Sequence, residues 1–310
     1  MHANDLFETI TNQLIADIES GAAGTWRMPW HTLADAGTPT SIDGRPYRGA
    51  NAVWLAMVAA TRAWTTGTYG TYRAWQRHGA QVRRGEKAIP VILWKPTTPK
   101  PDDSVTDDER SAGRRLLARA YNVFAAEQCD GADDIIAARA ERLAGRDAPD
   151  RIAAADRYFA AIGATIIEGG NRAFYQPSTD SIHVPPLDQF EHAAHHAGTL
   201  AHEATHWTGH AERLNRDLSG RFGSDSYAAE ELVAELGAAM WSAQMGLSAV
   251  TRPDHASYLA GWLRVLRSDA RALVTVASRS QAAVDYLNER AGQNTTSTGT
   301  DSDDSEEVAA

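Results

Sequence analysis

The feature that most constrains this chain is the pentapeptide His202-Glu203-Ala204-Thr205-His206. On an α-helix, positions i and i+4 project from the same face, so both histidines would lie side by side. Two imidazoles in that arrangement can bind one zinc ion at Zn–N distances of about 2.0–2.1 Å. The pentapeptide therefore predicts a helix in this region with a metal site on one face.

Glu203 follows the first of these histidines inside an otherwise apolar region. Zinc lowers the pKa of a bound water toward about 7, so a neighbouring carboxylate can take its proton near neutral pH. We therefore expect Glu203 to act as a general base. An exposed polar helix face is the alternative. It is disfavoured because Leu200 and Ala201 can pack toward a core, and a predicted strand at 182–185 precedes the helix.

A third protein ligand is expected if one metal position stays open for water. The segment 230–235 (EELVAE) predicts a second helix on which residues 231 and 235 share a face. We expect Glu231 to bind the metal and Glu235 to accept a hydrogen bond from the other nitrogen of a ligand histidine. Glu230 is the alternative ligand, and an exposed ion pair is the alternative role of Glu231. Gly209 and Gly237 would let the two helices approach closely.

Composition limits the class of protein. The 310 residues are enough for two domains, and the apolar content of 43% is in the globular range. No apolar run reaches the ~18 residues of a membrane span. The acidic, amphipathic N-terminus lacks the basic start and apolar core of a secretory signal. The single cysteine, Cys129, excludes an internal disulfide. Together these features favour a cytoplasmic location.

The first part of the chain, residues 1–130, mixes helical and strand patterns. Its expected elements are a helix that ends at Gly21, a helix capped by Asn51 that runs to about Thr61, a helix over 71–78, and strands over 88–94 and 119–127. The two strands are expected to pair with one another. Residues 96–113, which separate them, are rich in proline and acidic residues and are expected to form a disordered loop.

Residues 131–149 are alanine-rich and are expected to form a helical linker to a second domain at 150–290. The expected strands of that domain are 164–168, 173–176 and 182–184, and its expected helices are 189–209, 226–245, 254–267 and 269–289. Residues 291–310 contain many acidic and hydroxyl side chains and no basic one, so an acidic disordered tail is expected.

The net charge of −10 is unevenly distributed. Between Trp26 and Lys100 there are 11 Lys/Arg against 3 Asp/Glu, a local excess of +8 that leaves −18 for the rest of the chain. Single-stranded nucleic acid is held by positive charge along its backbone and by aromatic faces that stack on its bases. The residues expected to contact it are Arg45, Tyr47, Arg48, Arg73, Arg77, Arg83, Arg84 and Lys87.

Aromatic residues interleave with these charges, since six of the nine tryptophans lie between Trp26 and Trp94. Each base stacked on an aromatic ring would contribute about 1–3 kcal/mol. Taken one at a time, Trp54 and Trp75 are better explained as core residues, because they occur at helix-core spacing. The arginines favour binding as a group, because an exposed protein face usually mixes both signs of charge.

Both halves resemble the ArdC-like antirestriction proteins, in which an N-terminal single-stranded-DNA-binding domain is joined to a zincin-like metallopeptidase domain. The matching segments are 47–51 (YRGAN), 81–87 (QVRRGEK), 121–128 (YNVFAAEQ), 174–183 (FYQPSTDSIH), 200–214 (LAHEATHWTGHAERL) and 227–237 (YAAEELVAELG). The resemblance covers residues 5 to 288. It implies a mobile element such as a plasmid or phage, and protection of incoming DNA from host restriction.

We therefore predict an α+β protein of two domains. The first is an α+β single-stranded-DNA-binding domain, and the second is a mainly helical zincin-like metallopeptidase domain with a small antiparallel sheet and one Zn²⁺ per chain. A DNA-bound protein is the expected substrate. The alternative is a non-catalytic protein that coats single-stranded DNA and uses zinc to brace its fold. A metal-dependent nuclease is disfavoured, because such sites usually combine carboxylates with two metal ions.

Overall fold

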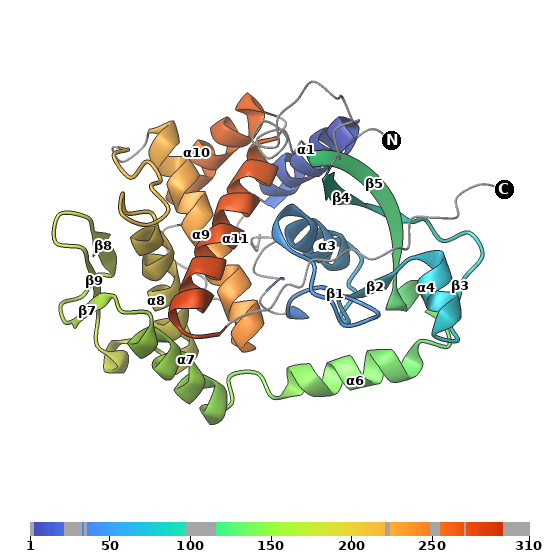
Figure 1. Cartoon of the computed structure of the whole chain (residues 1–310), viewed down its shortest axis with the longest axis horizontal. Coiled ribbons are helices and arrows are strands. Elements are labelled where there is room, and N and C mark those ends of the chain that lie inside the picture. The colour runs from blue at the N-terminus through green and yellow to red at the C-terminus, as the bar shows by residue number, and fades with distance from the viewer. Residues whose placement is uncertain are drawn as a thin grey trace, which may run out of the picture.

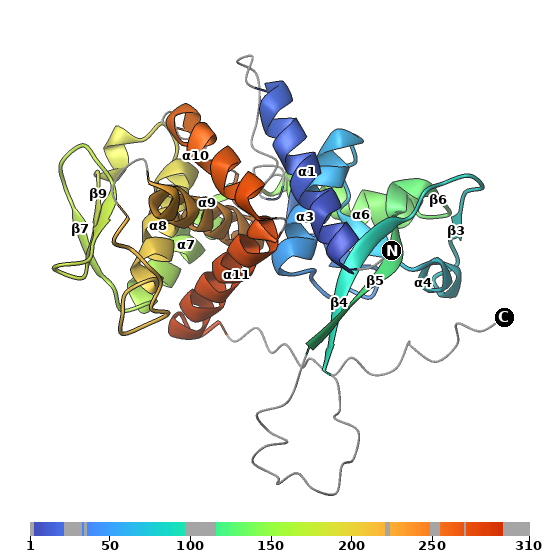
Figure 2. The same cartoon turned by 90° about the horizontal axis from the view of Figure 1, so that it is seen from above.

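The structure is a computed structural model that describes residues 3–21, 33, 36–96, 116–220, 224–248, 255–269 and 271–293. The segment expected to be a disordered loop, 96–113, lies outside the described residues except for Pro96, as does the expected tail from residue 294 on. The chain is α+β, as predicted, with a first part built around a curved sheet and a mainly helical second part beside it (Figures 1 and 2). None of the described helices is long and apolar enough to cross a bilayer.

A four-stranded sheet in the order β1-β2-β5-β4 organises the first part. Its elements are α1 (Ala3–Gly21), β1 (Thr40–Ser41), α3 (Gly49–Thr61), β2 (Thr68–Gly70), α4 (Tyr72–Arg77), β3 (Gln81–Val82), β4 (Ile89–Pro96), β5 (Leu116–Ala125) and β6 (Cys129–Asp130). The predicted pairing of the two long strands is confirmed, because β4 and β5 form one antiparallel ladder from Ile89–Val123 to Pro96–Leu116. Separately, β3 pairs with β6.

Asn51 does not cap α3, contrary to the sequence prediction. The helix begins two residues earlier, at Gly49, and its cap residue is Arg48. The Asn51 amide instead reaches β4, where it donates to the Ile92 carbonyl oxygen at 2.7 Å and accepts from the Ile92 amide at 2.8 Å. A side-chain amide can satisfy a backbone donor and acceptor at once, so Asn51 pins α3 to the sheet.

Two tryptophans of the first part are core residues, as the spacing suggested. Trp54 is 8% exposed and Trp75 is fully buried. Each indole N–H donates to a backbone carbonyl oxygen, from Trp54 to Pro90 at 2.9 Å and from Trp75 to Phe124 at 3.0 Å. Because buried indoles need a hydrogen-bond acceptor, these contacts hold both rings inside the fold and remove them as base-stacking candidates.

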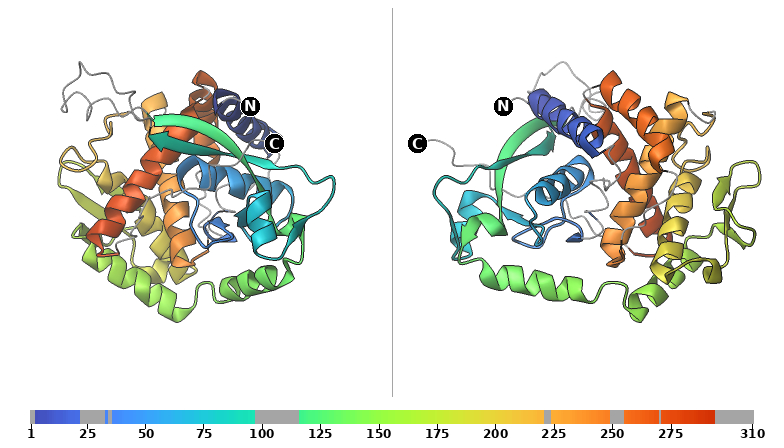
Figure 3. Two further views of the ribbon diagram at one scale, coloured as in Figure 1. Left: turned by 45° about the vertical axis from the view of Figure 1, so that its right-hand side comes forward. Right: turned by 180° about the vertical axis from the view of Figure 1, so that it is seen from behind.

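The second part begins after α6 (Asp133–Ala144), which runs along the outside of the molecule toward α7 (Figure 3). Its elements are α7 (Pro149–Ala161), β7 (Thr165–Glu168), β8 (Phe174–Gln176), β9 (Ser181–Val184), α8 (Ala193–Thr208), α9 (Asp225–Met245), α10 (His255–Ser268) and α11 (Ala272–Arg290). The small sheet is mixed instead of purely antiparallel, since β9 pairs in parallel with β7 and antiparallel with β8. Helix α7 occupies the chain before β7, so this strand enters the sheet without a hairpin.

Close contact between α8 and α9 depends on Gly237. A Cβ at this position would lie 2.6 Å from Thr205 Oγ1, so only glycine permits the observed approach. The prediction for Gly237 is confirmed, whereas the space around Gly209 is filled by Arg216 and Leu218. Helix α9 starts where the Ser224 hydroxyl accepts from the Tyr227 amide at 3.2 Å.

A single hydrophobic cluster extends through both parts of the chain, from Phe7 and Trp54 to Trp241 and Leu287. Helix α3 of the first part packs against α11 of the second. The predicted domain boundaries near residues 130 and 150 stay predictions, because this continuous core draws no line between the parts.

Candidate metal centre

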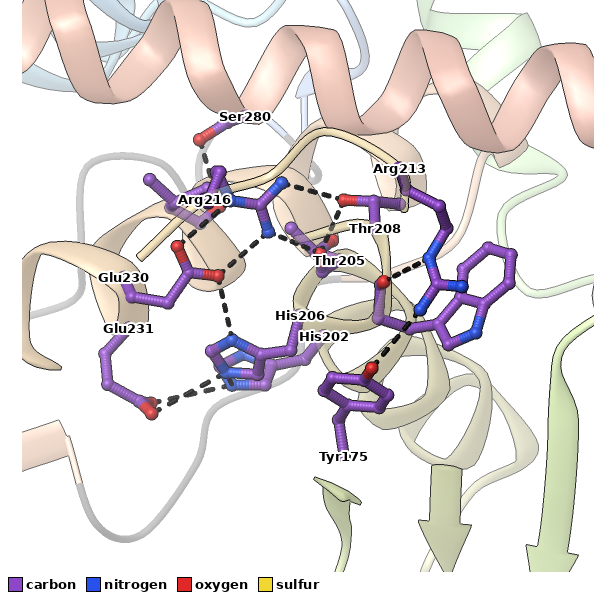
Figure 4. Close-up of polar contacts among 12 residues, drawn as sticks. Tyr175, His202, Thr205, His206, Thr208, Arg213, Arg216, Glu230, Glu231 and Ser280 are labelled. Atoms are coloured by element: carbon purple, nitrogen blue, oxygen red, sulfur yellow. Dashed lines mark hydrogen bonds and ion pairs between the residues drawn. The ribbon is translucent and has the colours of Figure 1, made fainter. Parts of the chain in front are cut away.

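Two helices bring the three predicted metal ligands together. His202 and His206 lie one turn apart on α8, and Glu231 faces them from α9 (Figure 4). Their side chains are only 3%, 13% and 9% exposed, respectively. Among the described residues, these three form the cluster of His, Cys, Asp and Glu side chains whose geometry could hold a metal ion.

The spacing of the donor atoms fits a small divalent cation. The two Nε2 atoms lie 3.2 Å apart, and each lies 3.6 Å from a Glu231 carboxylate oxygen. Ligands at about 2.0–2.1 Å in a tetrahedron are separated from each other by about 3.3–3.4 Å. The two 3.6 Å contacts involve the two different oxygens of Glu231, so the carboxylate faces both imidazoles at close to the spacing of tetrahedral ligands. Three protein ligands at such a site leave a fourth position for water.

Carboxylates on α9 also face the opposite nitrogens of both histidines. Glu230 Oε1 lies 3.2 Å from His206 Nδ1 within hydrogen-bonding geometry, and Glu235 Oε1 lies 3.5 Å from His202 Nδ1. A carboxylate at this position fixes the ring and directs the lone pair of Nε2 toward the metal. Glu230 was the alternative ligand from sequence, but its carboxylate meets the far side of the imidazole from the three converging donors.

Arg216 holds Glu230 in place. Its guanidinium donates to both Glu230 oxygens at 3.0 and 2.8 Å, to Thr208 Oγ1 at 2.9 Å and to the Thr205 carbonyl oxygen at 2.6 Å (Figure 4). Both partners of this ion pair are buried, at 7% and 11% exposure. Sequence reasoning missed Arg216, and only its distance of ten residues from His206 in an otherwise polar loop could have drawn attention to it.

We expect Arg216→Gln to weaken metal binding by about 10–100-fold, the usual effect of losing a group that orients a ligand histidine. Isothermal titration of the metal-free protein with Zn²⁺ measures the change. Arg213→Gln is the matched control, because Arg213 is equally buried, at 8%, and pairs with Asp180 instead of a metal-site carboxylate. Equal affinities for the Arg216 variant and the control would contradict the assigned role.

Arg213 forms a second buried cluster beside the site. Its guanidinium donates to Asp180, to the Tyr175 hydroxyl at 3.2 Å and to the Trp207 carbonyl oxygen at 2.6 Å, and it stacks 4.0 Å above the Trp207 ring. The pKa of Asp180 is lowered by the hydrogen bond from Arg213. This cluster ties the turn before β9 to the end of α8, so it fixes the small sheet relative to the metal ligands.

Without a metal, His206 holds a proton strongly. Burial by itself lowers its pKa, but the hydrogen bond to Glu230 and the charges of Glu231, Glu230 and Glu203 outweigh burial and raise the pKa to about 9. The pKa of Glu230 is lowered in turn, because hydrogen bonds from His206 and Arg216 outweigh its own burial. The carboxylates thus surround a position that a cation, either a proton or a metal ion, fills favourably.

Metal binding should release about one proton from His206 at pH 7.5, because a metal binds the neutral imidazole. Because the folded-state pKa is about 9, affinity should rise about tenfold per pH unit as the pH approaches that value and level off above it. Calorimetric metal titrations in buffers of different ionisation enthalpy measure how many protons are released on binding. A count near zero at pH 7.5, or affinity independent of pH, would show that His206 is neutral before the metal arrives.

Glu203 is 3% exposed and lies on α8 between the two histidines. Its charge contributes to the raised pKa of His206, which places the carboxylate within electrostatic reach of the ligand histidine. A buried carboxylate near a metal position is able to accept a proton, and the role of Glu203 as general base stays a prediction.

The predicted DNA-contacting residues separate into two groups. Exposed residues are Arg45 on the turn after β1, Arg73 and Arg77 on α4, and Arg83, Arg84 and Lys87 between β3 and β4. The turn and the end of α4 are joined by a 2.8 Å contact between Asp43 and His78. Arg83 also contacts Glu86 and the Glu127 carbonyl oxygen, so part of its charge is already paired.

Tyr47 and Arg48 are less accessible for contact with DNA than the sequence suggested. The Tyr47 ring packs edge-on against Tyr69 with ring centroids 6.1 Å apart, and burial raises its pKa. Arg48 is half-buried and forms an ion pair with Asp285 of α11. Both side chains therefore contact the protein itself at the junction of the two parts.

Comparison with known proteins gives a family match for each of the two parts of the chain. Residues 4–124 match the family model of the N-terminal domain of the anti-restriction factor ArdC, and residues 153–279 match that of a zincin-like metallopeptidase. The uncharacterised protein y4eC of Sinorhizobium fredii is 42% identical over 287 residues, which are 91% of each chain. DNA primase TraC of Escherichia coli is 35% identical over 90% of this chain, although the match spans only 27% of TraC.

Two solved structures are also similar. The metal-free ArdC antirestriction protein of plasmid R388 has a TM-score of 0.75 and 35% identity, with 93% of this chain and 98% of that chain covered. The Mn(II)-bound form of that protein has a TM-score of 0.73 and 33% identity, with 93% and 99% covered. The ligand helices, the sheet of the first part and these matches together show that the chain belongs to the ArdC family of antirestriction proteins and carries a zincin-like domain in its second half.

Proposed function

We propose that this protein binds single-stranded DNA through its first part and hydrolyses peptide bonds of DNA-bound proteins at the centre formed by His202, His206 and Glu231. The observation that carries the proposal is the convergence of three buried side chains whose nearest donor atoms lie 3.2–3.6 Å apart, with the Glu203 carboxylate near enough to raise the pKa of His206. A purely structural site would instead be expected to close all four positions with protein ligands.

A divalent cation fits this donor set. Two imidazole nitrogens and one carboxylate suit Zn²⁺ best, and they also accept Mn²⁺ or Co²⁺. The ArdC protein of plasmid R388 has been crystallised with Mn(II), which supports a divalent ion here and leaves its identity to measurement. When bound, the ion supplies Lewis acidity for attack on a peptide carbonyl.

The other catalytic and positioning roles belong to side chains of the protein. Glu203 accepts a proton from the attacking water and returns it to the leaving amine. Glu230 and Glu235 hold the two histidine rings in orientation, and Arg216 fixes Glu230 through two hydrogen bonds at 2.8 and 3.0 Å. Nearly all of these groups are buried, which strengthens their electrostatic interactions relative to those in bulk water.

Attachment to DNA would place the peptidase near its substrates. Tethering raises the effective concentration of a bound protein at the site, to the millimolar range for short connections. The direct test measures cleavage of a fluorescent, unfolded protein and of a single-stranded-DNA-bound protein, each with and without Zn²⁺ or Mn²⁺. Metal-dependent cleavage that is faster on the DNA-bound protein supports the proposal. If no mixture shows cleavage, the proposed peptidase activity is wrong.

We expect Arg84→Gln with Lys87→Gln to weaken binding to an oligothymidylate and to reduce its salt dependence. Each phosphate contact on single-stranded nucleic acid contributes about 0.7 to the slope of log K against log salt, so the slope should fall by about 1.4. Fluorescence anisotropy at four salt concentrations measures it. The control is Arg157→Gln with Arg172→Gln, an equal charge change at exposed positions of the second part. Equal slopes for the two double variants would locate DNA binding elsewhere.

A further inference from the structure

A cavity of about 460 Å³ lies where the first part, α6, α7 and the helices of the second part meet. In Figure 1, α6 runs below α3, α9 and α11, three helices that contribute residues to its wall. Its wall combines Leu33 and residues between Gly37 and Ala52 with α6, the start of α7, the C-terminal end of α9 and α11. Its volume is in the range of small-molecule sites, about 300–1,000 Å³, and it is separate from the metal centre because none of the metal-site residues lines it.

The charged side chains known to line this cavity are all positive. The described residues that line it include four arginines, Arg48, Arg139, Arg142 and Arg151, and no aspartate or glutamate. Arg48 is paired with Asp285. Arg151 donates to two backbone carbonyl oxygens, of Gly246 and Arg142, each at 3.0 Å. Within the described part of the chain, no carboxylate forms an ion pair with Arg139, Arg142 or Arg151.

Arg139 carries the strongest argument. It is 8% exposed, and its Nη2 donates to the carbonyl oxygens of Ala36 and Thr38, both at 2.9 Å. Its Nε is fully buried and meets no acceptor among the described residues. Burial and the neighbouring charge of Arg142 lower the pKa of Arg139. A buried guanidinium with no counter-ion among the described residues is costly, and an anion in the cavity would supply the missing charge.

Two glycines with left-handed backbone make room for these guanidinium groups. A Cβ at Gly37, where φ is +70°, would lie 2.8 Å from Arg139 Nη2. A Cβ at Gly246, where φ is +69°, would overlap the Arg151 guanidinium. Gly246 also ends α9 in the left-handed conformation. The backbone is thus shaped around the arginine side chains that line the cavity.

We propose that this cavity binds a phosphate monoester of about mononucleotide size, with Arg139, Arg142 and Arg151 as its cationic groups. A guanidinium presents donors in a planar fork that matches phosphate oxygens. The half-buried ring of Tyr47 and the amides of Gln244 and Asn288 line the same space and suit the uncharged part of such a ligand. The phosphate comes either from a free nucleotide or from the 5′ end of a DNA strand.

Calorimetry on the full chain, kept metal-free with EDTA so that phosphate does not meet the metal centre, tests the proposal. The probes are dAMP, deoxyadenosine, and one 12-nucleotide oligomer with either a 5′-phosphate or a 5′-hydroxyl. We expect dAMP to bind and to raise the melting temperature, and deoxyadenosine to do neither. Arg142→Gln should reduce dAMP affinity by about tenfold or more, the usual effect of losing a charge-assisted hydrogen bond. This variant should fold, because Arg142 is exposed.

Arg157→Gln, an exposed arginine on α7 that does not line the cavity, is the matched control and should bind dAMP as the wild type does. Tighter binding of the 5′-phosphorylated oligomer than of dAMP identifies a DNA end as the source. The reverse identifies a free nucleotide. The proposal is overturned if neither phosphate ligand binds, if deoxyadenosine binds equally well, or if Arg142→Gln leaves affinity unchanged.

Discussion

His206→Ala is expected to reduce the metal content of the purified protein from about one ion per chain to nearly none. His206 Nε2 is one of three donor atoms, and its neighbours at 3.2 and 3.6 Å cannot move to replace it because α8 and α9 are packed at Thr205 and Gly237. Loss of one ligand from a three-ligand site should weaken binding on the order of a thousandfold. Plasma emission spectroscopy of metal-reconstituted, desalted protein measures the content.

The control for this experiment is His195→Ala, which removes a histidine from the first turn of the same helix and leaves the three donor atoms intact. That variant should retain its metal. If His206→Ala still holds one ion per chain, or if carefully purified wild-type protein reconstituted with Zn²⁺ or Mn²⁺ holds none, the assignment of His202, His206 and Glu231 as ligands is wrong.

Glu203→Gln is expected to keep the metal and to slow peptide hydrolysis by about 10²–10⁴-fold. The amide has nearly the shape of the carboxylate but cannot accept a proton from water, and general base catalysis contributes a factor of this size. Cleavage of the DNA-bound protein substrate and metal content are measured on the same preparation. Unchanged cleavage in the variant would exclude Glu203 as the base.

Glu212→Gln is the matched control, because Glu212 is exposed and follows α8. A restriction-protection assay in cells adds a second readout. If Glu203→Gln loses cleavage but still protects DNA, coating of single-stranded DNA accounts for antirestriction and hydrolysis is dispensable to it. If protection is lost together with cleavage while DNA binding remains, antirestriction depends on peptide hydrolysis.

Local sequence patterns were enough to predict the helices and to place the two histidines of the candidate metal site on one helix face. Residues four apart on a helix share a face whatever the rest of the fold does, so His202 and His206 could be placed together from the sequence alone. The same holds for the apolar strands that became β4 and β5, and for Gly237, whose missing side chain permits close packing. These predictions needed only short-range geometry.

Contacts between distant segments were decided only by the tertiary structure. Glu230 and Glu231 are adjacent in sequence, and only the rotation of α9 against α8 turns one toward Nδ1 and the other toward Nε2 of His206. Arg216 has only a weak local signal, because the sequence around a buried arginine does not show which distant carboxylate it pairs with. Asn51 has the composition of a helix cap, yet a strand 41 residues away offered its amide two better-placed backbone partners.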